Sequence, residues 1–337
     1  MTSEPVQADD LMEQMLSAIE HDLKESLEAT NQWLPSGVHE MISYHLGWQE
    51  TETRTGKRLR PLMTLLCCQA SNGDWRQALP AAAAIEWIHN FSLLHDDIQD
   101  HSEMRRGRPT VWKIWGTAQA INTGDAIFAL SRLTTLRLNV KPEKILAVHR
   151  ILDETSLALT CGQHLDISFE QMSQVTTEQY LEMIAGKTAA LLGAACRLGA
   201  LLSPADDQQI EHFHAFGENL GLAFQVIDDL LGVWGSSEMT GKSSADDLRN
   251  RKRTLPIIHA LEHSNEFKKA WSADENSAAD ISTLKKWLDE AGSRDFTVAY
   301  AKHFTENATS ALEAAEASQP AGGHLAALAA RLLQRVA

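Results

Sequence analysis

The sequence predicts an all-α protein that folds as a single large domain. Hydrophobic residues make up 44% of the 337 residues but aromatic residues only 6%, and long segments are rich in alanine and leucine. This composition favours packed helices over strands. Turn-forming pairs such as Asn72-Gly73 and Ser203-Pro204 separate these segments. No segment alternates apolar and polar residues as a half-buried strand would, and no linker rich in Pro, Gly or Ser divides the chain.

The first expected helix covers residues 11–27 and is acidic. Its apolar residues recur every four positions, so it should pack on a neighbouring helix or on another subunit. These residues are Leu11, Met15, Ile19 and Leu23. We therefore assign residues 1–35 to a peripheral N-terminal arm and residues 36–337 to the main domain. Further helices are expected over residues 38–48, 58–71, 77–101, 117–136, 143–171, 176–202, 207–235, 251–263, 281–291, 295–316 and 322–336.

Composition also excludes several classes of partner. The formal net charge is -15, whereas binding to a phosphate backbone relies on basic surface, so no nucleic-acid partner is expected. The four cysteines show no CxxC spacing for zinc. No run approaches the roughly 20 apolar residues of a membrane span, and the first ten residues hold no apolar signal segment. The expected location is the cytoplasm.

Two acid-rich stretches, residues 95–100 and residues 225–229, each end an apolar helical segment. In the first stretch, Asp96 and Asp100 lie one helical turn apart and share a face, with Asp97 roughly 100° round the axis. Like charges so placed repel one another unless a cation binds between them. Mg²⁺ characteristically takes one or two carboxylates together with substrate phosphates. The pattern therefore predicts an enzyme that binds phosphates through magnesium.

Basic residues gather at a few points of this acidic chain. Residues 56–61 place three cations just before an apolar helix, whose N-terminal amides also attract an anion. Arg105 and Arg106 directly follow the first acidic stretch and can hold phosphate oxygens that a metal does not neutralise. A cluster such as residues 56–61, taken alone, is usually solvated surface, but the concentration of positive charge at a few points of an acidic chain favours phosphate binding.

Three lysines are further candidates for binding phosphate. Lys242 and Lys252 lie in a glycine-bounded charged segment that can cover a diphosphate or be an ordinary exposed loop. Lys187 lies among apolar residues, where a lysine is costly to bury without an anion unless it reaches the surface. All three are candidate contacts to a diphosphate.

The ordered set of motifs resembles the trans-isoprenyl diphosphate synthase (polyprenyl synthetase) family, in particular its geranylgeranyl and farnesyl diphosphate synthases. The motifs are Gly-Lys-Arg-x-Arg-Pro, Asp-Asp-x-x-Asp with a trailing Arg-Arg-Gly, Lys-Thr, Phe-Gln-x-x-Asp-Asp and Gly-Lys…Asp-Leu…Lys, and they span about residues 50–260. The resemblance implies an isoprenoid synthase-type helical bundle around a central cavity, with residues 36–337 as the catalytic domain. It also implies a homodimer.

The resemblance further assigns roles to residues, all expectations at this point. The metal ligands would be Asp96, Asp100 and Asp228, supported by Asp97, with three Mg²⁺ ions per active site. The allylic diphosphate would contact Arg105, Lys187, Gln225, Lys242 and Lys252. Isopentenyl diphosphate would contact Lys57, Arg60, His89 and Arg106. Thr188 and Gln225 would turn their polar atoms to the developing cation.

The implied reaction condenses isopentenyl diphosphate with an allylic diphosphate by ionisation, condensation and elimination. Two other functions stay open. A class I terpene cyclase also ionises an allylic diphosphate, but it needs one diphosphate site, and the second motif here is Asp-Asp rather than an Asn/Ser/Glu triad. A non-catalytic regulatory subunit of a prenyl synthase would be expected to lose acidic ligands, and the first motif is intact.

Product length depends on side chains near the first acidic motif. Phe91 lies five residues before Asp96, about 7.5 Å along the helix axis. An aromatic residue there with a small neighbour, here Ser92, resembles enzymes that stop at geranylgeranyl diphosphate. Farnesyl diphosphate and a product one isoprene unit longer than geranylgeranyl stay open.

The chain departs from the family pattern at Gly232, where many members carry a third Asp in the second motif. The partner of Asp228 one turn along the helix is therefore missing. From the sequence we expect weaker affinity for the third Mg²⁺ ion, not loss of activity.

Overall fold

The computed structural model describes residues 5–49, 56–235, 245–272 and 280–333, and nearly all its secondary structure is helical. The all-α prediction is confirmed. Within these ranges the strands are β1 (Met104–Arg105) and β2 (Arg108–Pro109), an antiparallel pair joined through Arg106 and Gly107. Both joining residues have positive φ, 53° and 80°. Two-residue strands are too short to show an alternating pattern, which is why the sequence does not predict them.

Two compact units make up the chain. The first comprises the described residues up to Leu157 together with 194–214 and 314–325, and the second comprises 158–193, 215–313 and the described residues from 326 onward. Each unit is described by itself. The helices that contribute residues to both are α7 (Pro142–Gln171), α9 (Ala190–Leu201), α10 (Asp207–Trp234), α16 (Ser293–Ala314) and α17 (Ala321–Leu333). The boundary predicted at residue 35 stays a prediction.

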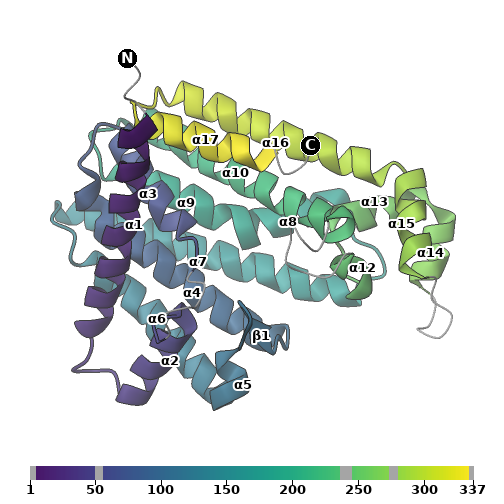
Figure 1. The fold of residues 1–337 in the computed structure, drawn as a ribbon, viewed down its shortest axis with the longest axis horizontal. Helices are drawn as coiled ribbons and strands as arrows, with labels where there is room; N and C mark the ends of the chain where they lie inside the picture. The colour runs from purple at the N-terminus through teal and green to yellow at the C-terminus, as the bar shows by residue number, and fades with distance from the viewer. Residues whose placement is uncertain (1–4, 50–55, 236–244, 273–279, 334–337) are drawn as a thin grey trace. The chain divides into compact units, whose positions relative to one another are not determined.

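Helices α4 (Leu79–Gln99) and α6 (Thr117–Thr135) run side by side in the first unit (Figure 1). The further elements of this unit are α1 (Pro5–Glu28), α2 (Ser36–Leu46), α3 (Leu59–Ala70), the single turn η1 (Trp75–Ala78) and α5 (Val111–Trp115). In α1, Met15, Ile19 and Leu23 are fully buried, and Trp87 Nε1 of α4 donates to Ser26 Oγ at 3.1 Å. The first helix therefore packs on a neighbouring helix of its own chain.

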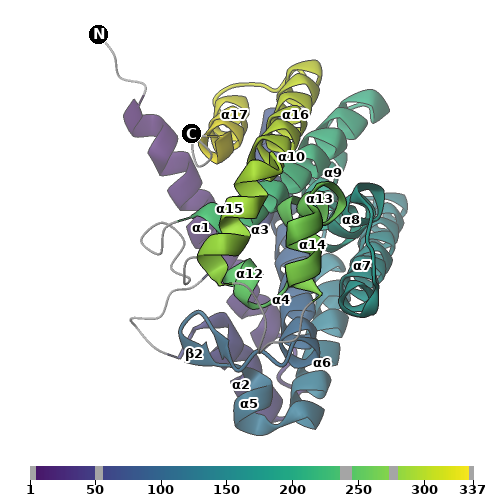
Figure 2. The same ribbon diagram turned by 90° about the vertical axis from the view of Figure 1, so that its right-hand side faces the viewer.

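The second unit contains a cluster of short helices, α12 (Asp246–Arg249), α13 (Leu255–His263), α14 (Asn265–Trp271) and α15 (Ile281–Glu290), which Figure 2 shows next to one another. The second unit also contains α8 (Thr177–Ile184). A capping box between Thr176 and Gln179 begins this helix. Helix α14, which the sequence pattern does not predict, starts where Ser264 Oγ accepts from Phe267 N at 3.2 Å. Helix α13 begins four residues later than predicted, because Thr254 is extended and Pro256 suits a first helical turn.

One helical stretch among the described residues, Thr177–Leu201, is long and apolar enough to cross a membrane. However, 67% of its most apolar window is buried inside the protein. A core helix has the same properties, because it too is apolar on all sides. The stretch thus gives no clear support for a membrane span.

Candidate active site

The first acidic motif lies at the C-terminal end of α4. Asp100 is the residue after the helix, and its backbone N donates to the carbonyl oxygen of Asp96 at 2.8 Å, so the two lie one turn apart as predicted. Asp100 is exposed and the Asp96 side chain is 22% exposed, whereas that of Asp97 is only 2% exposed. The two predicted metal ligands are therefore the accessible acids of the motif.

Arg105, from β1, joins these acids. Its Nε lies 2.8 Å from Asp97 Oδ1, and its Nη2 lies 3.4 Å from Asp96 Oδ2. Burial raises the pKa of Asp97 to about 6, although the charge of Arg105 opposes this shift. Asp97 thus holds Arg105 from the buried side of the motif, and its supporting role at a metal stays a prediction.

The donor set at the end of α4 fits magnesium. No three His, Cys, Asp or Glu side chains in the described part of the chain come close enough to hold a metal by themselves. Asp96 and Asp100 offer two carboxylates, and Mg²⁺ usually takes one or two together with waters and substrate phosphates. The motif therefore fits a magnesium ion that binds along with a diphosphate.

A second feature of the first unit is a basic cluster formed by Arg60, His89 and Arg106. Arg60 Nη1 lies 3.3 Å from His89 Nε2, and Arg60 Nε is buried without a hydrogen-bond partner in the described residues. Burial lowers the pKa of His89 well below its usual value, and the nearby charges of Arg60 and Arg106 add to this, so the ring is neutral at pH 7. An anion would supply the missing partner.

The neighbouring cations Arg58 and Lys57 have different environments from Arg60. Arg58 is buried and pairs with Glu20 at 2.5 Å and Glu86 at 2.8 Å, which fixes the start of α3 where the Arg58 backbone is left-handed. Lys57, a predicted substrate contact, is exposed. Gly56 leaves room for Arg106, because a Cβ on Gly56 would lie 2.9 Å from Arg106 Nη2.

In the second unit, two glycines position Lys187. A Cβ on Gly162 of α7 would lie 2.2 Å from the Lys187 backbone N, and one on Gly186 would lie 2.6 Å from the Ala158 carbonyl oxygen. This close approach occurs at a π-helical turn, η2 (Ala185–Ala189), a distortion often found at functional sites. Lys187 Nζ there forms an ion pair with Asp166, and its side chain is 29% exposed. It is neither fully buried nor unpaired.

Thr188 and Gln225 lie in one hydrogen-bond network with Asp229. Thr188 Oγ1 donates to Gln225 Oε1 at 2.8 Å, and Gln225 Nε2 donates to Asp229 Oδ1 at 3.0 Å. The other Asp229 oxygen accepts from the Tyr180 hydroxyl and from Leu255 N at 3.1 Å. Burial raises the pKa of Asp229 to about 7, against the effect of these donors. The network fixes the orientation of the Gln225 side chain.

The two acids of the second motif therefore differ in environment. Asp229 is 3% exposed and bound on both oxygens, whereas Asp228, the predicted metal ligand, is exposed. Lys252 is exposed, and its backbone N donates to the Asp247 carbonyl oxygen at 3.0 Å. Lys242 lies outside the described residues.

The predicted chain-length residues lie one to two turns before the acids. The ring of Phe91 packs 5.1 Å from that of Phe128 and 4.8 Å from that of His95. Ser92 Oγ donates to the His89 carbonyl oxygen at 2.8 Å. Sequence reasoning missed Phe128, which α6 supplies, as well as Asp166 and Tyr180. Of these, only Asp166 gave a signal, as a polar residue inside an apolar helix.

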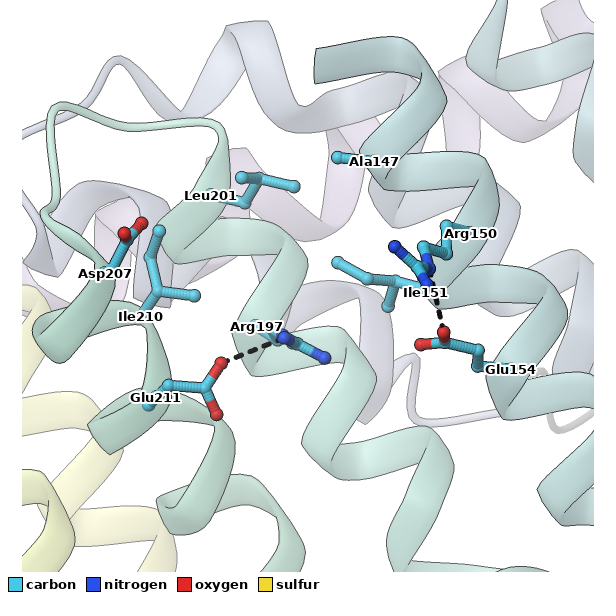
Figure 3. A pocket seen from close by; sticks show the side chains of 9 residues that line it. All are labelled: Ala147, Arg150, Ile151, Glu154, Arg197, Leu201, Asp207, Ile210 and Glu211. Carbon is cyan, nitrogen blue, oxygen red and sulfur yellow. Dashed lines mark hydrogen bonds and ion pairs between the residues drawn. The ribbon is translucent and has the colours of Figure 1, made fainter. Parts of the chain in front are cut away.

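A pocket of about 380 Å³ lies elsewhere in the first unit, among α7, α9 and α10 (Figure 3). Two ion pairs lie along it, Arg197 with Glu211 at 2.9 Å and Arg150 with Glu154 at 3.0 Å. None of its lining residues is a predicted site residue. Both arginines of the pocket are paired with glutamates, so we do not assign the active site to this pocket.

Comparisons with known proteins agree with these motifs. The family model for polyprenyl synthetase matches residues 46–290. A (2E,6E)-farnesyl diphosphate synthase of Mycobacterium tuberculosis is 38% identical over 280 residues, covering 79% of this chain and 77% of the relative. A geranylgeranyl diphosphate synthase of the same organism is 44% identical over 231 residues, covering 67% of this chain and 66% of the relative.

Solved structures are similar along almost the whole chain. A polyprenyl synthetase from Streptomyces coelicolor has a TM-score of 0.88 and 34% identity, covering 97% of this chain and 99% of its own. A geranylgeranyl pyrophosphate synthase from Corynebacterium glutamicum, complexed with isoprenyl diphosphate and magnesium, has a TM-score of 0.82 and 25% identity, covering 95% of this chain and 98% of its own.

Proposed function

We propose, from the premise that this chain belongs to the polyprenyl synthetase family of trans-isoprenyl diphosphate synthases, that it makes geranylgeranyl diphosphate as a magnesium-dependent cytoplasmic homodimer. Its substrates would be isopentenyl diphosphate and an allylic diphosphate. One observation carries the proposal. The first unit holds two features suited to diphosphates, the acids at the end of α4 with Arg105 and the half-buried cluster of Arg60, His89 and Arg106. Two diphosphate sites suit a coupling enzyme, whereas a cyclase needs only one.

Each feature has a role in this reaction. Asp96, Asp100 and Asp228 would hold magnesium, three ions per site, which stabilises the charge of the leaving diphosphate. Arg105, Lys187, Lys242 and Lys252 would bind the same diphosphate, with Lys187 exchanging its pairing with Asp166 for phosphate oxygens. Lys57, Arg60, His89 and Arg106 would bind isopentenyl diphosphate. The neutral ring of His89 accepts from Arg60 through Nε2 and would have Nδ1 to offer as a donor without adding a charge.

The chemistry needs no protein nucleophile. The allylic carbon–oxygen bond breaks and diphosphate leaves, and the double bond of isopentenyl diphosphate attacks the allylic cation. The released diphosphate then takes up a proton from the condensed product, which restores a double bond. Thr188 and Gln225 would present oxygen atoms to the cation, and the Asp229 network holds Gln225 in place. Apolar helix walls exclude the water that would otherwise trap the cation.

Product length is proposed from Phe91. Relatives of this chain include both farnesyl and geranylgeranyl diphosphate synthases. The contact of Phe91 with Phe128 supports geranylgeranyl diphosphate, because two aromatic rings from α4 and α6 meet where a growing chain would run past the acids. A shorter or longer product would mean that residues other than Phe91 limit the length of the prenyl chain.

The homodimer is supported by exposed apolar side chains on one side of α7, with others on α6 and directly after it. Leu146 and Leu157, three turns apart on one side of α7, are 70% and 67% exposed, and Ile121, Leu133 and Leu136 are also exposed. Large apolar patches usually mark interfaces, and a second copy of the chain can cover such a face symmetrically. Leu146→Glu with Leu157→Glu should give a monomer by light scattering, while Trp33→Gln, exposed elsewhere, should not. A double variant that stays dimeric would exclude this face.

The decisive experiment is incubation with Mg²⁺, labelled isopentenyl diphosphate and each of dimethylallyl, geranyl and farnesyl diphosphate, followed by chain-length analysis. We expect geranylgeranyl diphosphate, loss of product in Asp96→Ala, and normal product in Arg150→Ala, an exposed control in the pocket of Figure 3. A hydrocarbon released from a primer alone would indicate a cyclase. No product from the purified chain would favour a regulatory subunit.

A further inference from the structure

Arg132 lies on α6 one helical turn beyond Phe128, on the side away from the acidic motif. Two contacts between α6 and α4 give this direction. A Cβ on Gly124 of α6 would lie 2.6 Å from Cδ2 of His95 on α4. Four residues later on α6, the ring of Phe128 lies 5.1 Å from that of Phe91, four residues earlier on α4. The two helices therefore run in opposite directions, and Arg132 is about 6 Å farther from the acids than Phe128.

The guanidinium of Arg132 is held by partners on two helices. It lies over the ring of Phe128, with Cζ 5.0 Å from the ring centroid, which is a cation–π contact. It also forms an ion pair with Asp153 of α7. The Arg132 side chain is only 17% exposed, and its Nη1 is buried without a hydrogen-bond partner among the described residues. A fixed and largely desolvated charge thus adjoins the aromatic pair.

Other polar groups of α6 and α7 lie at the same level. His149 Nε2 of α7 lies 2.7 Å from Thr135 Oγ1 of α6, and Asp153 follows His149 by one helical turn. Burial lowers the pKa of His149, and the nearby charge of Arg132 adds to this effect. Arg132 is therefore part of a polar layer between α6 and α7, which begins where the two aromatic rings end.

An aromatic ring and a charged group would stop a hydrocarbon chain in different ways. Phe91 and Phe128 occupy volume, so truncating either ring opens space. A prenyl chain offers no hydrogen bond, and contact with the guanidinium would remove water from a charge without replacing it, which is costly. Space opened beside Arg132 would therefore still not accept a prenyl chain.

We propose that Arg132, held by Asp153, is a second limit on product length, one turn beyond the pair of Phe91 and Phe128. This inference rests on the proposed function, because it requires a prenyl chain that grows from the acids past Phe91. It makes Arg132 a residue that determines product specificity without contacting either diphosphate. One turn, about 5.4 Å, is close to the length of one extended isoprene unit, so the two limits differ by about one unit.

The test measures product length with Mg²⁺, labelled isopentenyl diphosphate and farnesyl diphosphate. Phe128→Ala should lengthen the product by about one isoprene unit and no more, because Arg132 remains. Phe128→Ala with Arg132→Met replaces the charge by an apolar side chain and should give products longer than those of Phe128→Ala. Arg132→Met alone should keep the wild-type length, because both rings remain. Product length does not depend on the amount of folded enzyme, so a purely structural role of Arg132 would not change it.

Matched variants separate charge from volume, each combined with Phe128→Ala. Arg132→Lys keeps a positive charge and should keep the product of Phe128→Ala. Arg150→Met removes an exposed arginine of α7 and should keep it too. Asp153→Ala is a second route to longer products, because Arg132 without its ion pair can turn to solvent.

The inference is overturned if Arg132→Met adds no length to the product of Phe128→Ala while the double variant folds normally by circular dichroism. Equal lengthening by Arg132→Lys and Arg132→Met would also overturn it, because charge would then not be the limit. In both cases a wild-type chain that makes prenyl diphosphates leaves the proposed function standing. A wild type that makes no prenyl diphosphate overturns both.

Discussion

The guanidinium of Arg105 bridges two acids of α4, with Nε 2.8 Å from Asp97 Oδ1 and Nη2 3.4 Å from Asp96 Oδ2. This contact ties the β1–β2 hairpin to the acidic motif. Arg105→Gln should lower the free energy of unfolding by about 1–3 kcal/mol, because it leaves the buried Asp97 without its charged partner. Denaturant titration measures this loss.

The matched control lies close in sequence. Lys113 pairs with Glu103 at 2.5 Å, but both side chains are exposed. Exposed pairs contribute little, so Lys113→Gln should change the free energy of unfolding by no more than about 0.5 kcal/mol. Equal effects of the two substitutions would show that Arg105 does not support Asp97.

Tyr180→Phe tests the network around Asp229. The substitution removes one donor to a buried carboxylate and leaves two, Gln225 Nε2 and Leu255 N. We expect a loss of about 1–3 kcal/mol in the free energy of unfolding. The Michaelis constant for isopentenyl diphosphate should be unchanged, because Tyr180 is not among the proposed contacts of that substrate. Tyr300→Phe, whose hydroxyl has no hydrogen bond among the described residues, serves as control.

Stability should fall in mild acid because of His45. Burial lowers its pKa from 6.5 to about 3, and the charges of Arg106, Arg105, Arg108 and Arg58 act in the same direction. Below pH 6.5 the unfolded chain takes up a proton that the folded chain does not. The free energy of unfolding should therefore be highest above pH 6.5 and fall as the pH drops towards 3, by up to about 1.4 kcal/mol per pH unit.

His45→Gln should make this slope shallower between pH 6.5 and pH 4, as measured by denaturant titration at each pH. A residual slope is expected from His89, whose pKa is lowered in the same direction. The exposed His303→Gln should retain the wild-type slope. An unchanged slope in His45→Gln would mean that the buried ring does not govern acid sensitivity.

Product length should change with the aromatic contact between α4 and α6. Phe91→Ala and Phe128→Ala should each lengthen the prenyl product, because either truncation removes one ring of the pair. Ser92→Ala, which keeps the small volume beside Phe91, should leave the product unchanged. Chain-length analysis of the prenyl products tests this prediction. An unchanged product in both Phe variants would mean that other residues limit the length of the prenyl chain.

Local pattern alone predicts most of the helices and both acidic motifs. Helical periodicity depends on residues three or four positions apart, so the pairing of Asp96 with Asp100 follows from spacing and is found in the structure. Short elements escape this reasoning. The β1–β2 hairpin and α14 each depend on a few local contacts, too few to leave a pattern in the sequence.

Roles within each motif depend on partners far along the chain. Arg58 and Arg60 belong to one basic run, yet Arg58 pairs with Glu20 and Glu86, while Arg60 lies beside His89. Periodicity places such residues on a helix face but does not tell which other element covers that face, because burial is a property of the packed chain.

In the second acidic motif too, the sequence determines some properties and the tertiary structure determines others. Its sequence determines that Asp228 and Asp229 end an apolar face of α10, and that Gly232 carries no acid. Only the tertiary structure buries Asp229 against Tyr180, 49 residues away, and brings the carboxylate of Asp247 against Gly232. The physical reason is that a carboxylate's environment is determined by the groups that replace water around it, and distant parts of the chain supply those groups.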